Sequence, residues 1–174
     1  MSRRNKYDRK DSLEIGESAQ FKFKELAEAK GWKVTPANEQ QDIHEHWDFF
    51  IEKDGEQSRV DVKAMKRIRR SDPYPQDKLV WIELHGVRDY DEGWLYGGGA
   101  DHIAFETKQG FIIVKRQDLI ELLEKTVDFK DQVSSPAKAL YKIYQRPGRP
   151  DKITMIETRK LLELRYAFWI QRTL

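Results

Sequence analysis

Two runs of alternating apolar and polar residues, separated by an Asp-Gly pair, constrain the fold of this chain more than any other feature. The first run covers residues 47–51, the second covers residues 60–64, and Asp54-Gly55 lies between them. Asp-Gly between two such runs predicts a two-residue turn and an antiparallel β-hairpin. A two-residue turn places Asp48 directly opposite Asp61 on the paired strands.

Asp48, Asp61 and Lys63 share one face of this predicted hairpin, because the side chains of a strand alternate in direction. The opposite face carries the apolar residues that a sheet buries, namely Trp47, Phe49, Ile51, Val60, Val62 and Ala64. Two opposed carboxylates repel each other unless a cation lies between them. The chain has no cysteine, and oxygen ligands without sulfur suit Mg²⁺ or Mn²⁺. The hairpin therefore predicts a site for a hard divalent cation.

The remaining pattern predicts an α/β fold with a central mixed sheet flanked by helices. Residues 1–11 are expected to form a basic flexible tail, followed by a helix from Ser12 until Gly31 ends it. Further strands are expected at residues 79–84, 102–105, 111–114 and 153–156, and further helices at residues 118–124, 136–144 and 161–164. Residues 12–174 are expected to form one domain, with a core over residues 12–125 and an extension over residues 126–174. A strand followed by a helix occurs twice, which indicates a repeated unit.

Charge is balanced over the whole chain but not within it. The 174 residues include 32 basic and 30 acidic ones, a formal net charge of +2, which excludes a general polycation. Lys66, Arg67, Arg69 and Arg70 nevertheless follow the hairpin directly, in a segment expected to be a loop. A local positive patch of this kind replaces the counterions of a phosphate backbone, so we expect it to bind nucleic acid, and DNA first of all. No apolar run is long enough to span a membrane, and the first residues lack the apolar core of a signal peptide, so we expect a cytoplasmic protein.

Together these features resemble the PD-(D/E)XK, or restriction-endonuclease-like, nuclease superfamily, and most closely its small Holliday-junction-resolvase-like or phage-encoded members. The resemblance covers about residues 13–83 and rests on Asp48, on Asp61-Val62-Lys63, on the leading helix with its acids and on the basic loop. It implies that Asp48, Asp61 and the carbonyl group of Val62 bind Mg²⁺ or Mn²⁺. It also implies that Lys63 orients or deprotonates the attacking water, or steadies the charge that develops on the phosphate. Trp47 stands where many members have proline.

The resemblance further implies an acid on the leading helix. The family pattern often places it about eleven residues before the closing glycine, and that position holds Gln20 here. Glu17 lies one turn earlier on roughly the same side, so we assign it this role, with Glu14 as the second choice. Glu83, on the strand after the basic loop, is a candidate for an additional metal ligand or DNA contact.

These expectations predict a Mg²⁺-dependent deoxyribonuclease, an endonuclease of DNA repair, recombination or phage and host DNA processing. Symmetric cutting of both strands calls for two active sites, and therefore for a homodimer. One alternative is a non-catalytic nucleic-acid-binding module on the same fold. A third is a zinc hydrolase, since Asp42, His44, His46 and Asp48 alternate and would face one way on a strand. The metal requirement distinguishes these three functions.

Overall fold

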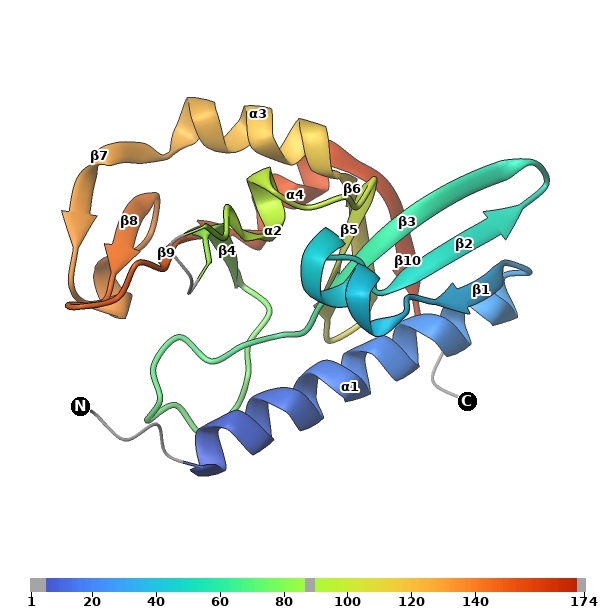
Figure 1. Cartoon of the computed structure of the whole chain (residues 1–174), viewed down its shortest axis with the longest axis horizontal. Helices are drawn as coiled ribbons and strands as arrows, with labels where there is room; N and C mark the ends of the chain where they lie inside the picture. Colours follow the sequence, from blue (N-terminus) through green and yellow to red (C-terminus); the bar gives the residue numbers. More distant parts are fainter. Residues whose placement is uncertain (1–5, 87–89, 172–174) are drawn as a thin grey trace.

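Two mixed sheets organise the chain, where the sequence pattern predicts one. The computed structural model describes residues 6–86 and 90–171. The six-stranded sheet has the order β1-β2-β3-β5-β6-β10, and the four-stranded sheet has the order β4-β9-β8-β7 (Figure 1). The strands are β1 (Lys33–Pro36), β2 (Phe49–Lys53), β3 (Glu56–Lys63), β4 (Leu79–His85), β5 (His102–Thr107), β6 (Gly110–Lys115), β7 (Asp128–Val133), β8 (Lys142–Gln145), β9 (Lys152–Glu157) and β10 (Arg165–Ile170). The helices are α1 (Lys6–Ala29), α2 (Gly93–Tyr96), α3 (Arg116–Thr126) and α4 (Thr158–Leu164), with a π-helical turn η1 (Gln41–Glu45) and a 3₁₀ turn η2 (Pro136–Lys138).

The predicted hairpin is confirmed as β2 and β3. Asp54 has a φ of 50° and Gly55 a φ of 83°, the positive values that a tight two-residue hairpin turn requires. The paired residues run from Lys53 and Glu56 at the turn to Phe49 and Val60 at the other end, which is the predicted register. One residue further on, the amide of Asp48 still donates a hydrogen bond to the carbonyl of Val60, over 2.9 Å.

Helix α1 covers one face of the six-stranded sheet (Figure 1). It begins at Lys6 rather than at Ser12, so residues 6–11 of the expected tail are helical, and residues 1–5 lie outside the described residues. The helix ends at Ala29, and Gly31 has a φ of 84°, as a helix-closing glycine does. Its buried residues recur at helical spacing and pack against apolar side chains of β2, β3, β5, β6 and β10; this cluster consists of Ala19, Phe23, Ala27, Phe49, Ile51, Val60, Val62, Ala104, Phe111, Ile113 and Trp169.

The other face of the six-stranded sheet packs against α2, α3, α4 and the four-stranded sheet. Apolar residues of β5 and β6, such as Ile103 and Val114, meet Leu119 and Leu123 of α3 and Leu161 of α4 there. The repeated unit is confirmed as β6 followed by α3 and β9 followed by α4, although its two copies belong to different sheets. No helix in residues 6–86 or 90–171 has the length and apolar character that crossing a membrane requires.

The C-terminal part differs most from its prediction. The helix expected over residues 136–144 is wrong: only the short turn η2 forms, and β8 follows. Tyr141 adopts a φ of 54°, which a continuing α-helix does not tolerate, and residues 144–145 pair with β9 instead. Strands β7 and β10 were not predicted, and β10 pairs with β6, so the extension completes the core sheet.

Candidate active site

The carboxyl group of Asp48 is held between α1 and β3. His46, two residues earlier, has a φ of 52°, and this left-handed residue ends the turn η1 before the chain enters β2. Asp48 Oδ2 accepts a hydrogen bond from the amide of Val62 over 2.7 Å, and Oδ1 accepts one from Gln20 Nε2 of α1, also over 2.7 Å. The Asp48 side chain thus continues the hairpin beyond its last backbone pair.

Asp61 is buried beside Asp48, and the two carboxyl groups perturb each other. Burial, and then the negative charge of Asp61, raise the pKa of Asp48 to about 7, while the amide of Val62 opposes the shift. Burial also raises the pKa of Asp61, against the charge of Lys63 and hydrogen bonding from Lys63 and Asp48. The pair therefore retains a proton near neutral pH, because two buried acids in contact do not both ionise easily.

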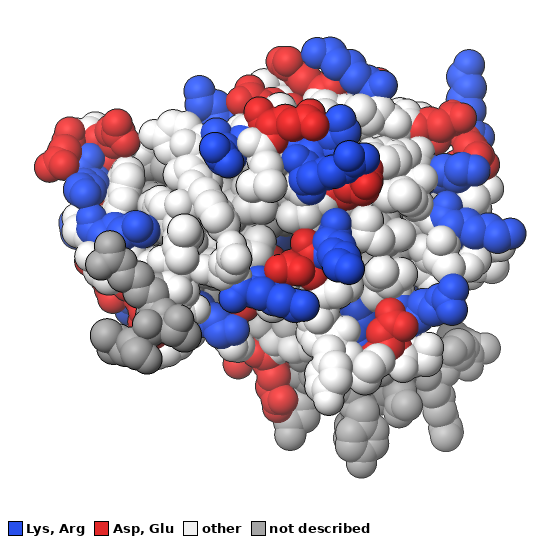
Figure 2. Space-filling model, turned by 180° about the vertical axis from the view of Figure 1, so that it is seen from behind, with Lys and Arg blue, Asp and Glu red and all other residues white. Residues whose placement is uncertain are grey.

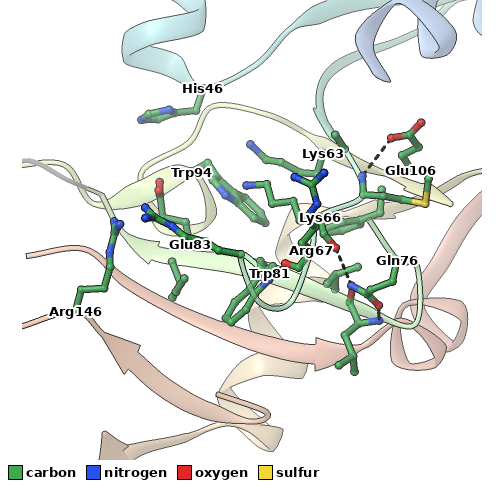
Figure 3. Close-up of a pocket in the computed structure, with 17 residues that line it drawn as sticks. His46, Lys63, Lys66, Arg67, Gln76, Trp81, Glu83, Trp94, Glu106 and Arg146 are labelled. Carbon is green, nitrogen blue, oxygen red and sulfur yellow. Dashed lines mark hydrogen bonds between the residues drawn. The ribbon is translucent and has the colours of Figure 1, made fainter. Parts of the chain in front are cut away.

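Lys63 connects this pair to solvent. Its Nζ lies 2.8 Å from Oδ2 of Asp61 and 4.6 Å from the centre of the Trp94 ring of α2. A carboxylate and an aromatic face both attract a cation, so the ammonium group is fixed in position. Lys63 lines a pocket of about 600 Å³ (Figure 3), and its charge therefore faces any ligand there.

The pocket lies between the end of β3 and the four-stranded sheet, and its lining is rich in basic residues. Its charged residues are Lys63, Lys66, Arg67, Arg70, Arg146, Glu83 and Glu106, and its aromatic ones include Trp81 and Trp94 (Figure 3). Over the face drawn in Figure 2, by contrast, basic and acidic side chains are interspersed. The positive character of the pocket is thus a local property, in agreement with the balanced charge of the chain.

The predicted basic segment borders two hollows. Lys66, Arg67 and Arg70 line the pocket beside Lys63. They also line a second hollow of about 460 Å³ next to the first turns of α1, where Arg69 joins them. Solvent reaches Lys66, but the surrounding protein, and then the charge of Lys63, lower the pKa of its ammonium group.

Hydrogen bonds hold this segment in place although it is a loop. Gln76 Nε2 donates to the carbonyl groups of Lys66 and Leu79, over 3.0 and 2.9 Å. The indole Nε1 of Trp81, on β4, donates to the carbonyl of Arg67 over 3.1 Å. The basic side chains therefore project from a backbone that is anchored to the four-stranded sheet.

The structure does not bring every predicted residue to the pair. Glu17 and Glu14 are exposed, and the residue of α1 that hydrogen-bonds Asp48 is Gln20, which stands at the position that the family pattern favours. Glu83 lies across the pocket from Lys63 (Figure 3), and burial raises its pKa while Lys63 lowers it. Sequence reasoning missed Arg146, which reaches the pocket from the segment after β8, because nothing in the local sequence indicates this approach.

The zinc alternative requires a strand through residues 42–48, and this prediction is wrong. Residues 41–45 form the turn η1, so Asp42, His44, His46 and Asp48 do not alternate along a strand. His46 Nε2 instead lies 3.5 Å from Oδ1 of Asp91. Within the described part of the chain, no three His, Cys, Asp or Glu side chains are placed to hold a metal ion together.

The donors that do meet are the two carboxyl groups of Asp48 and Asp61, next to the backbone of Val62. Both side chains supply oxygen only, both have raised pKa values, and each is stabilised by a nearby positive charge. Oxygen is the donor atom that hard cations such as Mg²⁺ prefer.

Comparisons of this chain with protein-family models, with curated proteins and with solved structures found no match. No relative's activity can therefore be transferred to it. Its function is inferred from the geometry of its own residues.

Proposed function

We propose that this protein is a metal-dependent nuclease that hydrolyses phosphodiester bonds of DNA, with α1, β2, β3 and β5 forming a restriction-endonuclease-like core. The observation that carries the proposal is the pair of buried, mutually perturbed carboxyl groups of Asp48 and Asp61, with Lys63 beside them at a basic pocket. The two acids and the lysine occur in the order that the family resemblance implies, with Asp48 directly before β2 and with Asp61 and Lys63 on β3.

A purely structural role explains this pair poorly. Burying a charged carboxyl group is unfavourable, and placing a second one beside it adds repulsion. Asparagine at either position would avoid that charge penalty and would still offer one acceptor oxygen. A fold that keeps both acids there is consistent with the binding of a cation.

In this proposal Asp48, Asp61 and the carbonyl group of Val62 hold Mg²⁺ or Mn²⁺. The bound metal would neutralise the two carboxylates, polarise the phosphate and lower the pKa of a water molecule. Lys63, fixed by Asp61 and Trp94, donates hydrogen bonds to the phosphate oxygens or to the attacking water. Gln20 acts as a positioning residue, because its hydrogen bond sets the rotamer of Asp48.

The basic residues that follow β3 bind the phosphate groups on either side of the cleaved bond. Lys66, Arg67 and Arg70 line the pocket next to Lys63, and Arg69 lines the adjoining hollow. Such contacts release counterions from DNA, so binding weakens steeply with salt. Cutting both strands of a duplex at once would in addition require two copies of the chain.

The test is a panel of linear, single-stranded, flap and four-way DNA, with a matched RNA, incubated with Mg²⁺, Mn²⁺, Zn²⁺ or EDTA. We expect cleavage of DNA with Mg²⁺ or Mn²⁺ and none with EDTA. The control is Asp48→Asn purified in parallel, which keeps one acceptor oxygen for the amide of Val62, replaces the oxygen that faces Gln20 with an NH₂ group and loses the charge.

Equal cleavage by wild type and Asp48→Asn would identify a contaminating nuclease and contradict the proposal. Tight, salt-sensitive DNA binding without cleavage under any metal would favour the non-catalytic binding module. That second function draws on one specific observation: Lys63 already compensates the charge of Asp61 without a metal.

A further inference from the structure

The pocket beside Lys63 has a second wall that the hairpin does not supply. Leu79, Val80, Trp81 and Glu83 of β4 form part of it, with Ile153 of β9 and with Arg146 from the segment after β8. Figure 3 shows Arg146 and Trp81 on the side opposite His46 and Lys63. The four-stranded sheet thus encloses a space that would otherwise be open.

The size of this space limits what enters it. A pocket of about 600 Å³ lies within the range of small-molecule sites, roughly 300–1,000 Å³. A stacked duplex is too wide for such a pocket, whereas one nucleotide that has left the stack fits, as in enzymes that take a base out of DNA.

The lining matches the parts of a nucleotide. Lys66 and Arg67 on one wall supply positive charge for phosphate, and Arg146, whose guanidinium group pairs with the buried Asp151, lies on the other wall. The ammonium group of Lys63 lies over Trp94, so Trp81, whose ring centre is 6.2 Å from that of Tyr144, is the other indole of the pocket against which a nucleobase can stack. Glu83, whose pKa burial raises, supplies a carboxyl group that can accept or donate hydrogen bonds to a base edge.

The wall is rigid as well as complementary. The hydrogen bonds from Gln76 and Trp81 to the carbonyl groups of Lys66 and Arg67 tie the basic segment to β4, so the backbone that carries its cations is already in place before a ligand arrives. Preorganisation of this kind lowers the entropic cost of binding. A flexible loop that merely attracted duplex DNA would need no such anchoring.

We propose that this pocket receives an unpaired nucleotide of a DNA strand, so that the protein recognises DNA where a strand is single or frays from a duplex. The inference rests on the proposed function and specifies its substrate class, because the protein would then select DNA by the presence of an unpaired strand. The scissile phosphate then lies next to Asp48 and Asp61, and the adjoining unpaired nucleotide occupies the pocket.

The experiment measures binding in EDTA, where no cleavage is expected, by fluorescence anisotropy with the full chain. The probes are a blunt duplex and the same duplex with a three-nucleotide tail that carries 2-aminopurine. We expect the tailed duplex to bind about tenfold more tightly or better, because stacking of one base is worth that much. We also expect the 2-aminopurine fluorescence to be quenched on binding.

Two matched variants locate the effect. Lys66→Gln and Arg69→Gln each remove one exposed positive charge, but only Lys66 lines the pocket, while both line the second hollow. We expect Lys66→Gln to reduce the preference for the tailed duplex about threefold or more. We expect Arg69→Gln to weaken both probes by the same factor, as a general phosphate contact does.

Equal binding of blunt and tailed duplexes by the wild type would overturn the inference, and so would identical effects of the two variants. Free dAMP binding as tightly as the tailed duplex would also overturn it, since the pocket would then be a site for free nucleotides. The two proposals fail separately. A tail preference without cleavage in either Mg²⁺ or Mn²⁺ supports the pocket and removes the nuclease, whereas cleavage without a tail preference does the reverse.

Discussion

Two neighbouring strands carry the same short pattern and use it differently. Asp61-Val62-Lys63 ends β3, and Glu106-Thr107 ends β5 with Lys108 directly after it, while β5 runs parallel to β3 beside it. The two acids are almost equally buried, with 4% of Asp61 and 7% of Glu106 exposed. Burial alone therefore does not distinguish them.

Their partners do. Glu106 accepts a hydrogen bond from Lys22 of α1 over 2.8 Å and one from the amide of Met65 over 3.1 Å, so both of its oxygens are satisfied. Asp61 has a cation in Lys63, but it also faces the carboxyl group of Asp48. A buried acid with a cation and an amide is part of the framework, whereas two buried acids in contact mark a candidate site.

The largest expected effect separates these two acids by activity. Asp61→Asn should lower Mg²⁺-dependent DNA cleavage by about three orders of magnitude or more, because it removes half of the charged ligands that the proposed function assigns to the metal. Glu106→Gln should leave the turnover of the folded protein within about tenfold of wild type, because Glu106 lines the pocket but its carboxyl oxygens accept from Lys22 and from the amide of Met65. The measurement is initial cleavage rate per folded protein, with folding checked by circular dichroism. Similar losses of cleavage rate in both variants would show that Asp61 and Glu106 do not differ in role.

The next effect is on stability and concerns Asp48. Its pKa rises from 3.8 to about 7 on folding, so between these values the folded state binds more protons than the unfolded state. The free energy of unfolding should therefore fall by a few kcal/mol as the pH rises from about 4 to about 7. Urea titrations at several pH values measure this slope.

Asp48→Asn should flatten that slope, while Glu106→Gln should keep it. Mg²⁺ should raise the melting temperature more at pH 8 than at pH 5, because protons compete with the metal for the carboxylates. A wild-type protein whose stability rose over this pH window would show that the two acids do not share a proton.

The smallest effect concerns the helix that faces the pair. Gln20→Ala should lower turnover about tenfold, because Asp48 loses the hydrogen bond that orients it. Glu17→Gln should change turnover less, since Glu17 is exposed. If Glu17→Gln lowered the cleavage rate at saturating Mg²⁺ more than Gln20→Ala does, the result would support Glu17 as the acid that the leading helix contributes.

The hairpin and its opposed acids could be predicted because their determinants are local. Asp54-Gly55 defines the turn, and the alternation of apolar residues defines the face, so the pairing of Phe49 with Val60 follows. The strand-to-helix junctions after Lys115 and Glu157 are local in the same sense.

The division into two sheets could not be predicted, because it depends on which distant strands pair. Nothing near Leu79 shows that β4 pairs with β9 and not with β3, and nothing near Arg165 shows that β10 pairs with β6. The second wall of the pocket, with Trp81 and Arg146, depends on those pairings. Gln20 stands at the position that the family pattern favours, but the type of its side chain, a neutral amide, does not indicate a role beside a metal, whereas an acid does.

The Asp54-Gly55 turn lies at the opposite end of the hairpin from the acids, and this separation bears on how the chain can vary in length. Insertions or deletions of equal size in β2 and β3 near the turn leave Asp48 opposite Asp61, because the register is counted along both arms. Adding or removing one residue in one strand alone shifts that register by one residue, and every side chain of that strand beyond the change then points to the opposite face. Descendants of this sequence can therefore lengthen or shorten the hairpin only symmetrically, unless a β-bulge absorbs the extra residue.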